Sequence, residues 1–367
     1  MDSVLAPLLP LFERERAAGR AMALGILVQT VGSTYRKAGA MLLIADHGEY
    51  AGLISGGCLE GDLGERARAV IGTGNASLVT YDLRNSDDLV WGLGLGCEGA
   101  MHILLLRVGP KEAWEPLAHF VAALAAHHPT AIGVLTESRD EGLPVGTLLL
   151  PEPRGQSPSA RTLPRTAGAR LLEPRTLAAL ASAPESGSVG WLDGPEARWK
   201  LLLLPLSPPP RLLLLGAGPD ALPVVDFATR LYWRVTLADH RPAYAVPSNF
   251  PLAERVVLVR PQEMAEALDL ASFAAAVVMS HHLPSDLEYL RALSASALGY
   301  LGLLGPPARR EKLLAELGPA AQRLRPRLRA PVGLDLGGRM PESIALGIIA
   351  EIHAFIHGKA ASEPRNE

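Results

Sequence analysis

Residues 211–221 read Arg-Leu-Leu-Leu-Leu-Gly-Ala-Gly-Pro-Asp-Ala, and the architecture of the chain's second half follows from them. The leucine run is continuous rather than alternating, which is typical of a strand buried on both faces of a parallel sheet. Gly216, Gly218 and Ala221 then form the pattern G-x-G-x-x-A, which is typical of a tight turn that opens a helix. We therefore predict a strand over residues 211–215 and a helix that begins close to Ala221.

The same alternation continues along the chain. Further apolar runs, separated by stretches with helical periodicity, occupy residues 235–238, 256–259, 274–280 and 300–304. Buried strands that alternate with helices form a parallel sheet covered on both faces. We therefore predict a Rossmann-like domain over residues 211–358, with residues 359–367 as a tail.

The glycine-rich turn allows two interpretations. Asp239 follows the second strand at about the place where a carboxylate binds the ribose of a dinucleotide, so NAD(P) binding is one of them. Against it, Pro219 removes a backbone N–H from the loop, and Asp220 would cap the helix itself and repel a pyrophosphate. The other interpretation is a Rossmann-like scaffold in which Gly216 and Gly218 serve only the turn.

Two groups of cationic or ionisable side chains in the second half are further candidates. His281 and His282 follow the apolar run 274–280, and open α/β sheets bind ligands at the carboxyl ends of their strands. The alternative is a pair of loop histidines with structural partners. The alternating arginines between residues 323 and 329 predict a solvated edge or a surface for an anion or a partner.

The first half contains a cysteine that follows two glycines and precedes a predicted helix. The run Ser-Gly-Gly-Cys-Leu-Glu at residues 55–60 leads into a helix predicted over roughly residues 59–71. A thiol at a helix N-terminus has a lowered pKa, because the helix dipole favours the thiolate. Gly56 and Gly57 leave room for a ligand to approach Cys58. The alternative is a small buried side chain at a strand–helix corner.

A second cysteine lies in a glycine-rich loop. Around Cys97 stand Gly92, Gly94, Gly96 and Gly99. A loop with so few side chains exposes backbone N–H groups, which suits an anionic ligand, although a tight bend between strands is the alternative. Two thiols in two such loops indicate a site for a soft metal or for sulfur, with Cys58 and Cys97 as its candidate ligands.

Two short segments recur along the chain. Residues 23–27, Ala-Leu-Gly-Ile-Leu, resemble residues 131–135, Ala-Ile-Gly-Val-Leu, and residues 39–43 resemble residues 146–150. A duplicated β-unit is one interpretation, and chance similarity is the other. The second copy has no cysteine, so any thiol chemistry was not duplicated with it.

Composition and proline content predict the division of the chain. We expect a mixed α+β domain over residues 1–150 and a proline-rich connector with a few strands over residues 151–210. The connector ends in Pro208-Pro209-Pro210, which can continue neither a helix nor a central strand. The fold class predicted for the whole chain is α/β, with the mixed domain first and the Rossmann-like domain second.

The overall composition excludes several classes of protein. The 367 residues are 48% hydrophobic and 20% charged, which excludes a disordered chain. A net charge of −3 with 5% aromatic residues argues against nucleic acid and anionic membranes as partners. With two cysteines, no signal-peptide pattern and no apolar run of membrane-span length, we expect a soluble cytoplasmic protein.

Taken together, the motifs resemble those of the XdhC/CoxI family of xanthine dehydrogenase accessory proteins. In the first half, the resemblance rests on residues 32–40, 55–60 and 94–99. In the second half, it rests on residues 216–220, 239–242, 280–286, 300–306, 330–337 and 341–345. Residues 151–200 match the family poorly.

This resemblance implies a chaperone for the molybdenum cofactor rather than an enzyme. Members of the family bind molybdopterin, support its sulfuration together with a cysteine desulfurase, and deliver it to a hydroxylase of the xanthine dehydrogenase or CO dehydrogenase type. They are usually cytoplasmic homodimers. The resemblance implies the following cofactor-binding residues: Arg36, Lys37, Gly56, Gly57, Cys58, Glu60, Gly96, Cys97, Gly216, Gly218, Asp239 and His281. It implies that the two cysteines bind the metal. Arg36 and Lys37 would supply positive charge for the pterin phosphate.

Two alternatives to the carrier follow from the same residues. An NAD(P)-dependent oxidoreductase would use the G-x-G-x-x-A turn and Asp239, with Arg241 as partner of a 2′-phosphate. A pure scaffold would instead join the target enzyme to the desulfurase without holding the cofactor.

Overall fold

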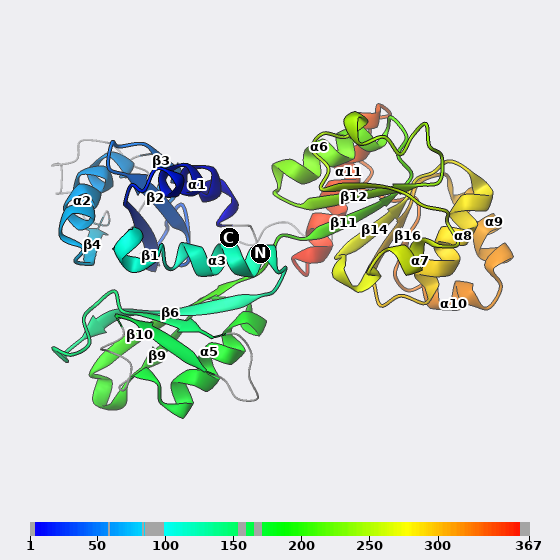
Figure 1. Ribbon diagram of the computed structural model, residues 1–367. Coiled ribbons are helices and arrows are strands. Elements are labelled where there is room, and N and C mark those ends of the chain that lie inside the picture. Colours follow the sequence, from blue (N-terminus) through cyan, green and yellow to red (C-terminus); the bar gives the residue numbers. More distant parts are fainter. Residues whose placement is uncertain are drawn as a thin grey trace. The chain divides into compact units, whose positions relative to one another are not determined.

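The computed structural model describes residues 4–57, 59–82, 84, 99–152, 159–164 and 171–359. The chain separates into two compact units, and the division falls between Pro208 and Pro209 (Figure 1). The division therefore lies in the proline run that was expected to act as a spacer, where neither helix nor central strand can continue.

The first unit contains two five-stranded antiparallel sheets. The strand order is β3-β2-β1-β5-β4 in one and β8-β7-β6-β10-β9 in the other. The first sheet and its helices comprise α1 (Leu9–Ala17), β1 (Met22–Gly32), β2 (Met41–Ala45), β3 (Tyr50–Gly52), α2 (Glu60–Thr73), β4 (Ser77–Asp82) and β5 (Gly99–Val108). The second comprises α3 (Leu117–Ala125), β6 (Thr130–Ser138), β7 (Leu148–Pro151), β8 (Ala160–Leu163), α5 (Pro174–Ser186), β9 (Gly190–Asp193) and β10 (Trp199–Leu206).

The two sheets are copies of one β-unit, which confirms the duplication. We call residues 22–108 the first repeat and residues 130–206 the second repeat. Gly39, with φ +94°, donates its N–H to the carbonyl of Leu27 at 2.8 Å. Gly146, with φ +88°, donates to the carbonyl of Leu135 at the same distance. In both repeats the pairing of the long strands shifts register next to that leucine.

The repeats share one core and each has a helix on its outer face. Ile26 of β1 and Val134 of β6 belong to the same buried cluster, together with side chains of α1 and α3. On the outer faces, Leu63 of α2 packs against the first sheet and Leu180 of α5 against the second. Alternate residues of the central strands therefore serve two cores, which explains why β1 is buried on both faces over its first seven residues.

The proline-rich segment 151–210 differs from the expected connector. Its described residues form β8, α5, β9 and β10, all of which belong to the second repeat. Two of the prolines stand where a backbone N–H group is dispensable, since Pro174 begins α5 and Pro195 begins a short turn of 3₁₀-helix, whereas Pro184 lies inside α5. The second repeat thus spans both the region expected as the mixed domain and the region expected as the connector.

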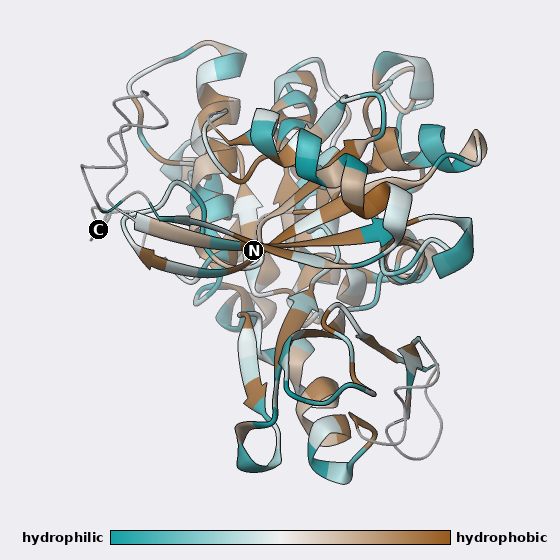
Figure 2. Cartoon of the chain, turned by 90° about the vertical axis from the view of Figure 1, so that its left-hand side faces the viewer, coloured by the Kyte–Doolittle hydropathy of each residue, from teal (hydrophilic) through white to brown (hydrophobic). Residues whose placement is uncertain are grey.

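The second unit is the predicted parallel sheet, and the predicted fold class is confirmed. Its six strands run in the order β13-β12-β11-β14-β15-β16. Its elements are β11 (Arg211–Leu215), α6 (Ala221–Arg230), β12 (Arg234–Asp239), β13 (Arg255–Leu258), α7 (Met264–Ala267), β14 (Ala275–Val278), α8 (Leu283–Ser294), β15 (Tyr300–Leu303), α9 (Pro307–Leu317), α10 (Ala320–Leu324), β16 (Leu328–Arg329) and α11 (Pro341–Ile356). Helices α6 and α11 cover one face and α8 to α10 the other, and hydrophobic colour follows the strands in Figure 2.

One of the alternating arginines has a structural task rather than a solvated one. Arg327 donates to the carbonyls of Leu293, Ser294, Ser296 and Leu298, and Arg323 donates to that of Ser294. These carbonyls lie at or just beyond the end of α8, where backbone acceptors have no partner within the helix. The expectation of a solvated edge is therefore wrong for Arg327, which is half-buried, whereas Arg323 is exposed as expected.

Candidate functional site

Three motifs of the first repeat meet at one end of its sheet. Gly32, the last residue of β1, pairs with Gly99, the first residue of β5. A Cβ atom on Gly99 would lie 2.4 Å from the Ser33 carbonyl oxygen and 2.6 Å from Thr34 Cγ2. A Cβ atom on Gly56 would touch the Tyr35 ring at 4.0 Å. The loop after β1, the loop after β3 and the start of β5 are therefore neighbours.

A buried carboxylate fixes the loop that leads into α2. Glu60 accepts the backbone N–H of Ser55 at 3.0 Å and that of Leu59 at 3.1 Å, and it also accepts the Ser55 hydroxyl. The Ser55 hydroxyl oxygen in turn accepts the Leu59 N–H at 3.0 Å. Glu60 and Ser55 are only 3% and 4% exposed. These contacts are internal, so Glu60 acts on the loop's shape.

Glu60 is ionised in this setting. Burial alone would raise its pKa, but the hydrogen bonds donated by Ser55 and by the backbone of Leu59 outweigh burial and hold the pKa below its usual range. The negative charge also stands at the first residue of α2, where the helix dipole favours it. The loop is thus closed by charge-assisted hydrogen bonds, which are about twice as strong as neutral ones.

Among the described residues, nothing covers the backbone beside this loop. Gly57 has φ +104°, and a Cβ atom there would meet none of the described atoms within 4 Å. Gly61 and Gly64, on the first turns of α2, are equally open. Open space over three glycines lets a flat ligand approach the main chain closely. Cys58 stands next to Gly57 in the sequence; Cys58, Gly96 and Cys97 lie outside the described residues, so the placement of both thiols stays a prediction.

The two cations expected near the thiols lie in the loop after β1. The Thr34 hydroxyl donates to the carbonyl of Arg36 at 2.8 Å, and Ala40 donates its N–H to the carbonyl of Lys37 at 3.2 Å. Lys37 is exposed and Arg36 is half-buried. Within the part of the chain that the structure describes, neither side chain forms an ion pair. Both remain available to an anionic group.

In the second unit, the predicted ribose carboxylate is already engaged. Asp239 is fully buried and accepts the N–H of Ala217 at 2.8 Å. Arg241 donates to it from the backbone at 2.9 Å and from Nε and Nη2 at 2.9 and 2.7 Å. Burial would raise the pKa of Asp239, but the Arg241 guanidinium and these N–H groups hold it low. Asp239 therefore ties the glycine turn to the next strand.

The glycine turn is shaped by a close approach of two strand ends. Gly216 has φ +125°, and a Cβ atom there would lie 2.6 Å from the Met279 carbonyl group and 2.7 Å from Ser280 Cα. Only glycine fits this approach. Gly218 lies beside the Asp220 carboxylate, whose Oδ1 would be 2.6 Å from a Cβ atom there. Gly216 therefore has a steric role in this turn, whereas a side chain at Gly218 would displace only the end of the Asp220 side chain.

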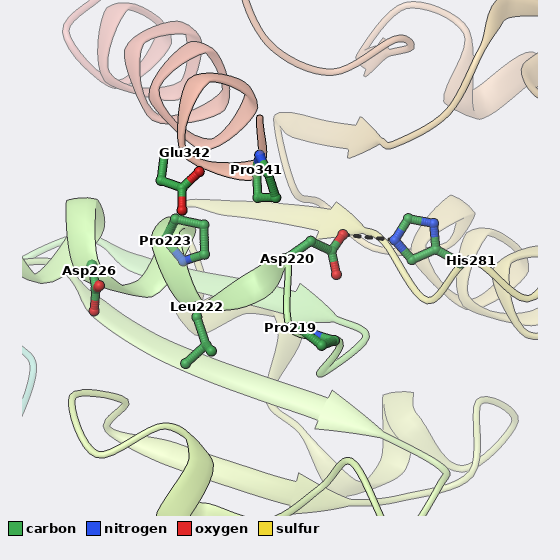
Figure 3. Close-up of a pocket in the computed structure, with 8 residues that line it drawn as sticks. All are labelled: Pro219, Asp220, Leu222, Pro223, Asp226, His281, Pro341 and Glu342. Carbon is green, nitrogen blue, oxygen red and sulfur yellow. Dashed lines mark hydrogen bonds and ion pairs between the residues drawn. The ribbon is translucent and has the colours of Figure 1, made fainter. Parts of the chain in front are cut away.

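Asp220 and His281 join the two loops at the switch point of the sheet. His281 Nε2 lies 2.7 Å from Asp220 Oδ2, and the expected cap of α6 by the Asp220 side chain is not made (Figure 3). His281 adopts φ +58°, an uncommon conformation for a residue other than glycine. The pair borders a pocket of about 540 Å³ between the starts of α6 and α11, where Asp226 and Glu342 add two more carboxylates. Among the described residues, three carboxylates and no lysine or arginine therefore line this pocket at the start of α6, which disfavours a pyrophosphate there.

Sequence reasoning missed a polar cluster beside this pair. Ser285 Oγ lies 2.9 Å from His282 Nδ1 and 3.4 Å from His240 Nε2. Nearby, Asp286 is buried, accepts the Ser280 hydroxyl at 2.5 Å and accepts Arg309 Nη2 at 2.6 Å. The sequence runs at residues 239–242 and 280–286 contain most of these polar side chains. Their presence was noted, but which of them contact each other was not predicted.

Metal-binding clusters and membrane-spanning helices are both missing from the described residues, which include neither cysteine. Among these residues, no group of three histidine, cysteine, aspartate or glutamate side chains is arranged to hold a metal. Across the same residues, no helix combines the length and the apolar character needed to cross a bilayer.

Comparison with known proteins identifies the family. The sequence model described as "XdhC Rossmann domain" matches residues 212–352, and the model of the XdhC and CoxI family matches residues 15–82. A protein of Bacillus subtilis (strain 168), named as a probable subunit of xanthine dehydrogenase, is 32% identical over 329 residues, which cover 90% of this chain and 91% of that protein. The chain belongs to the XdhC and CoxI family. The predicted family resemblance is confirmed.

Two further proteins resemble this XdhC/CoxI chain over most of its length. The "Molybdenum cofactor insertion chaperone PaoD" of Escherichia coli (strain K12) is 23% identical over 340 residues, which are 91% of this chain and 83% of that one. A crystal structure described as a xanthine dehydrogenase from Bacillus halodurans superposes with a TM-score of 0.76 at 27% identity, covering 99% of this chain and 98% of that one. The XdhC-type role supported by these relatives is that of an accessory protein.

Proposed function

We propose that this XdhC/CoxI protein holds the molybdenum cofactor at the end of the first repeat and delivers it to a molybdenum hydroxylase. Two relatives support this role, one named as part of a xanthine dehydrogenase and the other as a molybdenum cofactor insertion chaperone. The observation that carries it is the open glycine backbone at Gly57, held in shape by the buried Glu60 carboxylate.

The described residues fit a flat ligand with an anionic group. No described residue comes within 4 Å of a Cβ atom built on Gly57, Gly61 or Gly64, so a ring system can lie against this stretch of backbone. Arg36 and Lys37 lie in the neighbouring loop and would bind the phosphate. Cys58 follows Gly57 and precedes α2 by two residues, and its thiolate would be the soft donor toward the metal.

Each residue then has its own task in the carrier. When bound, the cofactor would supply a molybdenum centre for the hydroxylase that receives it. Cys58 and Cys97 would hold the ligand through sulfur, Arg36 and Lys37 would neutralise its phosphate, and Glu60 would fix the shape of the loop without touching the ligand. A carrier of this kind needs no residue that moves a proton or forms a bond to carbon.

The partners proposed for this carrier are two enzymes and a second copy of the chain. The receiving enzyme is a hydroxylase of the xanthine dehydrogenase or CO dehydrogenase type, and a cysteine desulfurase would provide the sulfur for sulfuration of the bound cofactor. Homodimer formation and a cytoplasmic location complete the proposal. They follow from the family resemblance.

NAD(P) binding is not the function that the second unit favours. The Asp239 carboxylate accepts four hydrogen bonds within the protein, and Asp220 with His281 lies where a pyrophosphate would bind. We expect calorimetric titration with NAD(H) and NADP(H) to show weak binding or none. A micromolar dissociation constant for either dinucleotide would favour the oxidoreductase instead.

The proposal is tested by cofactor retention in cysteine variants. Molybdopterin content would be measured by mass spectrometry on protein purified from a molybdenum-replete host. We expect Cys58→Ala to retain less cofactor than Cys97→Ala, because Cys58 stands next to a helix start, which favours the thiolate. Cys58→Ser should not rescue, since a hydroxyl is a hard and poorly ionised donor.

Controls separate this result from unfolding. Each variant must keep the thermal melting temperature of the wild type, which is expected because the substitutions change little volume. Full retention and full hydroxylase activation in a folded Cys58→Ala protein would refute the role of that thiol. Wild-type protein without any bound molybdopterin would refute the carrier itself.

A further inference from the structure

One aromatic side chain of the first repeat, Tyr35, is left 60% exposed by the folded chain. It stands in the loop after β1, directly before Arg36 and Lys37. The Thr34 hydroxyl donates to the carbonyl of Arg36 at 2.8 Å, which closes a turn around Tyr35. Single exposed aromatic side chains are common on proteins, so what this ring can do depends on its neighbours.

The Tyr35 ring lies beside the glycine backbone of the candidate site. A Cβ atom built on Gly56 would lie 4.0 Å from Tyr35 Cδ2, which is ordinary van der Waals contact. At Gly57, the next residue, a Cβ atom would meet none of the described atoms within 4 Å. The ring therefore borders a stretch of main chain on which a flat molecule has room to lie, and its own side chain is open to solvent.

The second repeat shows that the scaffold does not need an exposed ring at this place. Tyr35 stands eight residues after Leu27, whose carbonyl accepts the N–H of the turn glycine. Leu143 stands eight residues after Leu135, which has the same role in the second repeat. Leu143 is fully buried in the cluster that α5 forms with its sheet. Among the described residues, the cluster that α2 forms with the first sheet does not include Tyr35, so this side chain is not used for packing there.

The chemistry of the Tyr35 side chain suits a planar heterocycle. An aromatic ring stacks on such a ligand because both present π faces, and the contact removes apolar surface of both from water. Arg36 and Lys37, the next two residues, would bind an anionic group of the same ligand. Three consecutive residues thus offer one ring and two cations beside an open backbone.

We propose that Tyr35 is a binding residue of the carrier and stacks on the pterin ring of the cofactor. This inference rests on the proposed function, because that function supplies the planar ligand. Tyr35 then selects for a flat ring, whereas Arg36 and Lys37 select for the phosphate. The contact is made by the ring face and needs no hydroxyl group, so phenylalanine at this position should still bind.

The test uses pterin-6-carboxylate, a fluorescent planar pterin with one anionic group. It would be titrated into full-length protein purified from a host that makes no molybdopterin, with affinity measured calorimetrically. Contact with a phenol ring quenches pterin fluorescence, whereas contact with a phenyl ring quenches it far less. We expect the wild type to bind and quench, Tyr35→Phe to bind within about twofold of the wild type with little quenching, and Tyr35→Ala to bind at least about fivefold more weakly.

The matched control is Tyr50→Ala, which should bind and quench as the wild type does. Tyr50 is 48% exposed and is the first residue of β3, whereas Gly56 follows the end of that strand. All variants should keep the melting temperature of the wild type, because both side chains are exposed. Equal affinity of the wild type and a folded Tyr35→Ala would overturn the inference, as would full quenching by Tyr35→Phe or no pterin binding by the wild type. If Tyr35→Ala does not fold, the quenching by Tyr35→Phe still decides.

Molybdopterin content separates this inference from the proposed function. Equal molybdopterin content in wild type and Tyr35→Ala, both purified from a molybdenum-replete host, would refute the role of Tyr35 and leave the carrier standing. Wild-type protein that contains no molybdopterin, but binds pterin-6-carboxylate with quenching that depends on Tyr35, would refute the carrier and leave Tyr35 as a pterin contact.

Discussion

The two repeats of the first unit have the same scaffold but different loops. Both run through five antiparallel strands in the same order, and both turn at a glycine with positive φ after the first strand, Gly39 in one and Gly146 in the other. The contact between them is reciprocal. A Cβ atom on Gly39 would lie 2.8 Å from Val189 of the second repeat, and one on Gly146 would lie 2.4 Å from Ala76 of the first.

The differences gather at one end of the first repeat. Between β4 and β5 the chain inserts residues 83–98, which include Cys97, whereas residues 194–198 suffice between β9 and β10. Helix α2 begins with Glu60, which closes the preceding loop, whereas α5 begins with Pro174. The second repeat thus shows what the fold needs, and whatever the first repeat has in addition is available for function.

Removing the insertion is expected to have the largest effect. Replacing residues 83–98 with residues 194–198 joins Asp82 to Gly99 through a hairpin that the second repeat already uses between Asp193 and Trp199. We expect a folded protein whose molybdopterin content falls to background, measured by mass spectrometry beside circular dichroism. A shortened protein that keeps its molybdopterin would show that cofactor binding does not depend on residues 83–98.

Loss of the buried carboxylate is expected to cost stability as well as function. Glu60→Ala leaves the N–H groups of Ser55 and Leu59 and the Ser55 hydroxyl without their acceptor, which should lower the free energy of unfolding by about 2–3 kcal/mol. Denaturant unfolding measures it. Glu65→Ala, on the exposed side of the same helix, should change stability by less than about 0.5 kcal/mol. Equal effects of the two variants would remove the special role given to Glu60.

The reciprocal glycine contacts predict an intermediate effect. Gly146→Ala should destabilise the protein by about 1–3 kcal/mol, because its new methyl group meets Ala76 and its φ is positive. Gly39→Ala should cost less, since the Val189 side chain can shift. Gly19→Ala is the control, with φ +68° but open space, and should cost about 1 kcal/mol. A larger loss of melting temperature in Gly19→Ala than in Gly146→Ala would contradict the close packing of the repeats.

Acid should weaken the first repeat through Glu60, with the smallest effect. The pKa of Glu60 in the folded protein lies below its usual value of 4.5, so its stabilisation is complete above that pH and is lost as pH falls below it. The stability difference between wild type and Glu60→Gln should therefore shrink as pH falls below about 4.5. A difference that stays constant over this range would mean that the carboxylate is protonated in both states or in neither.

Much of the fold could be predicted because its signals are local. The continuous leucine run at residues 211–215 and the G-x-G turn after it predicted a parallel strand and a helix, and β11 and α6 follow that prediction within a residue. The recurrence of residues 23–27 at 131–135 predicted the duplication. The connector was misjudged because prolines at helix starts and strand ends resemble those of a linker until the pairing of β10 with β6 is known.

The candidate site, too, could be predicted from the sequence only in part. Residue types and spacing were enough to single out Gly57, Asp239 and His281, because motifs of glycine, carboxylate and imidazole are readable along the chain, whereas Glu60 was expected from the family resemblance. Their tasks depended on the contacts of the folded chain. Glu60 turns inward to Ser55 and Arg241 turns back to Asp239 within a few residues, whereas the contact between Asp239 and Ala217 joins the end of β12 to the turn after β11, 22 residues earlier. Motif spacing alone does not say which of these partners a side chain takes. Arg327, by contrast, donates to the carbonyl of Ser296, 31 residues earlier in the chain, and this contact exists only once α8 and the segment that follows α10 have packed together.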